Sequence, residues 1–127
     1  MEEWKEKFLT AIKDEPLIVY KTINPDYLTL QLATPLEDRD DAILLYIINE
    51  GKNGEGKEEF SISDQAWIAT LLPYENYDLT EEIIVEEAKK MGFDPSGLNL
   101  FKTVDETNVL DAIKDFDALV KKLQNYH

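Results

Sequence analysis

Two strand-like segments that follow each other closely constrain this chain most. Residues 27–32 alternate, with Leu28, Leu30 and Leu32 on one side and polar residues between them. That two-residue period is typical of a strand with one buried face. Residues 42–48 are apolar throughout, which predicts a central strand that is covered on both faces or flanked by neighbouring strands.

Other segments predict further strands and helices around this pair. β-branched and alternating stretches predict strands at residues 17–22, 59–62 and 98–104. Apolar residues at helical spacing predict helices at residues 2–13, 65–72, 80–91 and 107–125. The glycine-rich residues 49–57 are expected to form a flexible hairpin loop.

Several helix ends carry recognisable signals. Asp64 is a suitable N-cap for the helix at 65–72, and we expect Pro73 to stop that helix. The helix at 80–91 is expected to start at Thr80 or Asp78 and to end before Gly92.

Short connections between consecutive strands favour an antiparallel meander. We therefore expect an α+β fold in which about four to five strands pack with about four helices. No repeat or linker divides the sequence, which predicts a single domain over 1–127.

The residue inventory excludes several kinds of site. The chain has no cysteine, so disulfides, thiolate metal sites and cysteine nucleophiles are absent. Its one histidine is His127, the last residue. We expect no cofactor, no metal site and no catalytic set. The sequence also shows neither a signal peptide nor an apolar run long enough to span a membrane, so we expect a cytoplasmic protein.

The net charge of −14 is concentrated in the middle of the chain. Residues 25–64 carry ten acidic and three basic side chains, and residues 65–97 carry seven and two, so these segments contribute −7 and −5. Such a field repels DNA and RNA, and direct nucleic-acid binding is not expected.

Acidic residues gather at two places that could contact a basic partner. Asp78, Glu82 and Glu86 have the spacing of one helix face, with carboxylates about 5–6 Å apart, which resembles the spacing of backbone phosphates. The loop before residue 42 adds Glu37, Asp38, Asp40 and Asp41. This pattern favours a module that mimics nucleic acid and blocks a DNA- or RNA-binding protein. An acidic solvated face is also typical of a soluble protein without such a role.

A metal-dependent nuclease is the alternative hypothesis. Asp26 follows a proline, and two downstream Glu-x-Lys patterns resemble the short signature of restriction-type nucleases. These patterns are Glu50 with Lys52 and Glu55 with Lys57, and we expect both in the hairpin loop. Such chemistry needs the Glu and Lys on a rigid strand that faces the Asp.

The apolar residues of the last helix leave two uses open. Val109, Ile113, Phe116, Val120 and Leu123 follow a 4-3-4-3 spacing, which is typical of a dimer seam. In a single helix at the end of a small domain, we expect this stripe to cover the sheet.

Part of the chain resembles a family of small bacterial and prophage proteins that is defined only as a domain of unknown function. The resemblance spans residues 26–123 and includes Thr34-Pro35, the apolar strand with Tyr46, and Ser63-Asp64 before a helix. The family usually has a glycine shortly after the aspartate, where this chain has Gln65-Ala66. The resemblance implies an α+β fold and a phage or prophage setting, in which inhibitors of the anti-CRISPR type occur, but no activity.

Overall fold

The computed structural model describes residues 2–36 and 42–127. All of the strands belong to one antiparallel sheet in the order β1-β2-β3-β4-β6-β5. The strands are β1 Ile18–Ile23, β2 Leu28–Pro35, β3 Ala42–Lys52, β4 Glu58–Ser63, β5 Asp94–Ser96 and β6 Asn99–Asp105. The helices are α1 Glu3–Ile12, α2 Trp67–Glu75, α3 Glu81–Lys90 and α4 Val109–Gln124. The predicted α+β meander is confirmed, with the short β5 as an addition.

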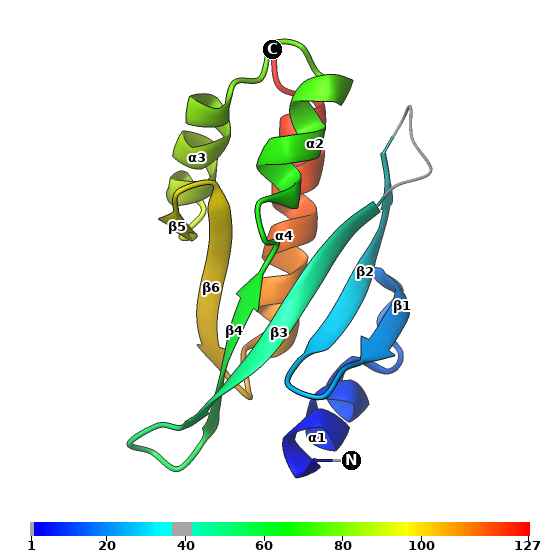
Figure 1. The fold of residues 1–127 in the computed structure, drawn as a ribbon, viewed down its shortest axis with the longest axis vertical. Coiled ribbons are helices and arrows are strands. Elements are labelled where there is room, and N and C mark those ends of the chain that lie inside the picture. Colours follow the sequence, from blue (N-terminus) through cyan, green and yellow to red (C-terminus); the bar gives the residue numbers. More distant parts are fainter. Residues whose placement is uncertain (1, 37–41) are drawn as a thin grey trace.

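The core lies between one face of the sheet and the helices. In Figure 1, β3 and β4 cross in front of α4. The predicted inward residues of β2 are buried, and Ile43, Leu45 and Ile47 of β3 are buried on the same face of the sheet. The apolar stripe of α4 was predicted either to cover the sheet or to form a dimer seam. It belongs to the core of the single chain, where Val109, Ile113, Phe116, Val120 and Leu123 are all buried.

The other face of the sheet is open. Because side chains alternate along a strand, Leu44, Tyr46 and Ile48 of β3 point away from α4. Leu44 and Tyr46 are half-buried and Ile48 is exposed. β3 is therefore central because strands flank it, not because helices cover both of its faces.

The hairpin between β3 and β4 differs from the prediction. Residues 49–57 do not form one loop, because β3 continues to Lys52 through a bulge between Asn49 and Gly51. Gly51 has a φ of 94°, and its N–H donates to Oδ1 of Asn49 at 2.5 Å. A glycine tolerates this left-handed conformation, so the strand pairing resumes beyond the bulge.

The helix α2 also differs from the prediction. Pro73 lies inside the helix, which ends only at Glu75. Leu71 and Leu72 are buried, and the N–H of Asn76 closes the last turn on the carbonyl of Leu72 at 2.9 Å. Packing thus holds a helical turn around a residue that usually ends one. Trp67, the first residue of α2, is 39% exposed.

Candidate functional site

The helix α3 presents the acidic residues that the sequence singled out. Oγ1 of its N-cap Thr80 accepts a hydrogen bond from the N–H of Ile83 at 3.2 Å, as the predicted start at Thr80 requires. Ile84 and Ala88 are buried, whereas Glu82 and Glu86 are exposed. The two carboxylates stand one turn apart on the outer side of the helix.

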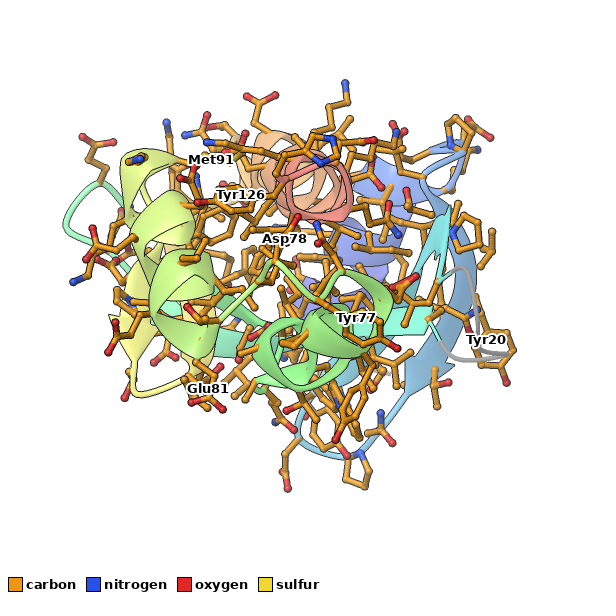
Figure 2. All side chains as sticks on the ribbon, turned by 90° about the horizontal axis from the view of Figure 1, so that it is seen from above. Tyr20, Tyr77, Asp78, Glu81, Met91 and Tyr126 are labelled. Atoms are coloured by element: carbon orange, nitrogen blue, oxygen red, sulfur yellow. The ribbon has the colours of Figure 1, made fainter. Side chains whose placement is uncertain are left out.

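Asp78 does not belong to this helix face. It lies before the N-cap, where its N–H donates to Oδ1 of Asn76 at 3.0 Å. The asparagine side chain stabilises a turn there, so the predicted row of three carboxylates on one helix is wrong for Asp78. Figure 2 places Asp78 on the connection between α2 and α3, and Glu81 on the first turn of α3 and farther from α4.

A hollow runs along the outer side of α3. Its volume is about 340 Å³, and its lining consists of Glu81, Glu82, Val85, Glu86 and Leu98. Leu98 comes from the turn between β5 and β6, so the hollow requires the tertiary fold. It combines two apolar side chains with three carboxylates, and we call it the α3 groove.

Among the described residues, no lysine forms an ion pair with a carboxylate of the groove, although the charge of Glu86 helps to raise the pKa of Lys90. Ion pairs between described residues involve Lys7 with Glu3, Lys57 with Glu55, Lys90 with Glu87, Lys102 with Asp115, Lys121 with Asp117 and Lys122 with Glu87. None of these pairs includes Asp78 or an acidic residue of the groove. Their negative charge is available to a partner.

Glu87 is the residue of α3 that the sequence reasoning missed. It is 9% exposed, and its carboxylate lies 2.6 Å from Nζ of Lys122 and 3.1 Å from Nζ of Lys90. Hydrogen bonds from Lys122 and then Lys90 hold its pKa below the ordinary value. The signal was its position three residues after Ile84, on the inward side of the helix.

The second predicted acidic focus is not part of the described structure. Glu37, Asp38, Asp40 and Asp41 all lie outside the described residues.

The residues of the nuclease hypothesis occupy separate places. Asp26 is exposed in the turn between β1 and β2. Glu50 and Lys52 lie on the extended β3, which corrects their predicted place in the loop, whereas Glu55 and Lys57 lie in the hairpin turn. Within residues 2–36 and 42–127, no three acidic or imidazole side chains converge as a metal site would require.

The corner between β4 and α2 is organised by Asp64, which is fully buried. Its carboxylate accepts hydrogen bonds from the N–H groups of Ala66 and Ile68, both at 3.0 Å, and of Leu100 at 2.9 Å. Burial raises the pKa of Asp64, and these three backbone bonds act in the opposite direction. Asp64 thus binds the first turn of α2 and the start of β6, but it is not the N-cap residue that was predicted, because α2 starts at Trp67 with Ala66 at the N-cap position.

No known protein family, curated protein or solved structure matches this chain. The resemblance to prophage proteins therefore rests on the residues quoted for it. Among the described residues, no helix is both long and apolar enough to cross a membrane.

Proposed function

We propose that this chain is a non-catalytic, cytoplasmic protein-binding module of the phage or prophage type. It acts by occupying a basic surface on a partner that otherwise binds DNA or RNA. The α3 groove is the contact surface, and Glu82 and Glu86 are its central charges.

The observation that carries this proposal is the composition of the α3 groove. A lysine or arginine side chain has an apolar stem and a cationic head. Val85 and Leu98 offer contacts for the stem, and the three carboxylates, which form no ion pair with a described lysine, offer partners for the head. A basic protein surface therefore fits this groove better than an anionic or fully apolar ligand does.

Nucleic-acid mimicry follows from the spacing of these charges. Glu82 and Glu86 are one helical turn apart, so their carboxylates repeat at a distance comparable with that between phosphates of a duplex. The net charge of −14 adds long-range attraction to any basic groove.

Affinity capture with matched charge reversals tests the proposal. The wild-type protein, the double variant Glu82→Lys/Glu86→Lys and the double variant Glu3→Lys/Glu6→Lys are immobilised and exposed to bacterial lysate at low salt. Recovered proteins are quantified by mass spectrometry. The second variant is the control, because it changes net charge equally on α1, where Glu3 and Glu6 are exposed.

We expect nucleic-acid-binding proteins to be recovered by the wild type and by the α1 variant. The α3 variant should recover at most about a tenth as much, because a lost interfacial charge pair costs on the order of 2 kcal/mol. If both variants lose recovery equally, the effect comes from the net charge of the protein and not from the α3 groove. If all three proteins recover the same amount of partner, the α3 groove is not the contact surface.

A further inference from the structure

The open face of the sheet carries a second hollow, separate from the α3 groove. Tyr46 of β3 pairs with Ser63 of β4, and Ser63 pairs with Phe101 of β6. Side chains at paired positions point to the same face, so two aromatic side chains flank one small residue. The resulting pocket has a volume of about 260 Å³ and shares no lining residue with the α3 groove.

The lining of this pocket is mixed: Tyr46, Ile48 and Phe101 give it apolar surface, and its polar groups are uncharged. Ser61, Ser63, Gln65 and Asn99 contribute hydroxyl and amide groups, and no acidic or basic side chain contributes to it. This is unusual for a chain with 31% charged residues. Ser63 Oγ donates to Oδ1 of Asn99 at 2.5 Å and accepts from the N–H of Gln65 at 3.0 Å, so these bonds fix Asn99 and the backbone of Gln65.

The backbone beside the pocket is held in an unfavourable conformation. Gln65 and Ala66 have φ values of 48° and 67°, in the left-handed region that non-glycine residues rarely adopt. This conformation is strained in residues with a side chain, because it brings Cβ too close to the following carbonyl oxygen. The hydrogen bonds to the buried Asp64 maintain this conformation, which brings Gln65 into the pocket lining. Strain of this kind is concentrated at functional sites.

We propose that this pocket binds a neutral saccharide. Serine and tyrosine hydroxyls both donate and accept hydrogen bonds, and the amides of Gln65 and Asn99 do so through separate atoms, which suits a ligand rich in hydroxyl groups. The rings of Tyr46 and Phe101 offer apolar surface to the C–H face of a sugar ring. A phosphorylated ligand would meet no cation in the pocket and a strongly negative protein around it.

Titration followed by ¹H–¹⁵N NMR tests this proposal on the full chain. The probes are glucose, galactose, mannose and N-acetylglucosamine, and cytosine serves as a flat neutral ring without hydroxyl groups. We expect saturable shifts with at least one sugar, with a Kd on the order of 1–10 mM. The largest shifts should fall on the side-chain amides of Gln65 and Asn99.

Two variants and a control locate the binding. Phe101→Ala should weaken sugar binding about tenfold, and Ser61→Ala, which deletes one hydroxyl, about threefold. Tyr20→Ala should leave it unchanged, because Tyr20 points to the same face but lies on the edge strand β1, as Figure 2 shows. The proposal is overturned by an absence of saturable shifts with all four sugars up to about 100 mM. Saturation by cytosine alone, or wild-type affinity in both pocket variants, overturns it as well.

Discussion

Thr34, Ser63 and Asp64, which belong to the Thr-Pro and Ser-Asp motifs of the sequence, each connect parts of the fold. Oγ1 of Thr34 donates to the carboxylate of Asp117 on α4. Ser63 bonds to Asn99 of β6, and Asp64 bonds to the backbone of both α2 and β6. These contacts give all three residues a structural role in the fold, so the motif is not evidence of an activity.

At Ala66, the left-handed backbone predicts a stabilising substitution. Ala66→Gly removes the Cβ penalty of a positive φ, and the N–H that bonds to Asp64 is retained. We expect the free energy of unfolding to rise by about 1 kcal/mol, measured by urea denaturation.

The matched control is Ala118→Gly on the exposed side of α4. There the backbone is helical, so glycine should lower the free energy of unfolding by about 1 kcal/mol. A loss of similar size in Ala66→Gly would contradict the strain assigned to this corner.

Among the secondary-structure elements, α3 and α4 are joined by the ion pair between Glu87 and Lys122. Because the pKa of Glu87 is lowered in the folded protein, its stabilising effect is complete above the ordinary value of 4.5 and is lost as the pH falls through the folded-state pKa. Glu87→Gln should therefore lower the urea midpoint at about pH 7, and the difference from wild type should shrink toward about pH 3.

Glu86→Gln provides the comparison for this measurement. Glu86 is exposed and forms no ion pair with another described residue, so its variant should differ little from wild type across the same pH range. A Glu87→Gln difference that stays constant with pH would mean that the ion pair is not its source.

Local sequence patterns predicted most elements, because period and capping are encoded by neighbouring residues. The buried faces of β2 and α4 and the Thr80 cap are of this kind. The continuation of β3 past Asn49 and of α2 past Pro73 depends on pairing and packing with distant residues, which a local pattern does not contain.

The candidate site was predictable to a smaller degree. Glu82 and Glu86 follow from helical spacing alone. The contribution of Leu98 and the separation of Asp78 from the helix arise from a turn and a strand connection elsewhere in the chain. The open-face pocket combines residues from four strands and the β4–α2 corner, so only the register of the sheet reveals it.

Across the whole molecule, the lysines are distributed unevenly among the acids. They pair with carboxylates of α1, of the β3–β4 hairpin and of α4, and with the inward Glu87 of α3. Between described residues, the outer side of α3 receives no such pair. Other exposed acids, such as Asp26, Glu50 and Asp111, also form no ion pair with a described residue, so the binding proposal rests on the combination of carboxylates with Val85 and Leu98 in one groove.

The most direct test of that proposal is the affinity for the captured nucleic-acid-binding partner as a function of salt, with and without duplex DNA. Salt at about 500 mM screens exposed charges far more than salt at about 50 mM. The affinity should therefore fall at least about tenfold over this range, and duplex DNA should compete for the same surface. An affinity that is indifferent to salt and unaffected by DNA would contradict an acidic surface that takes the place of nucleic acid.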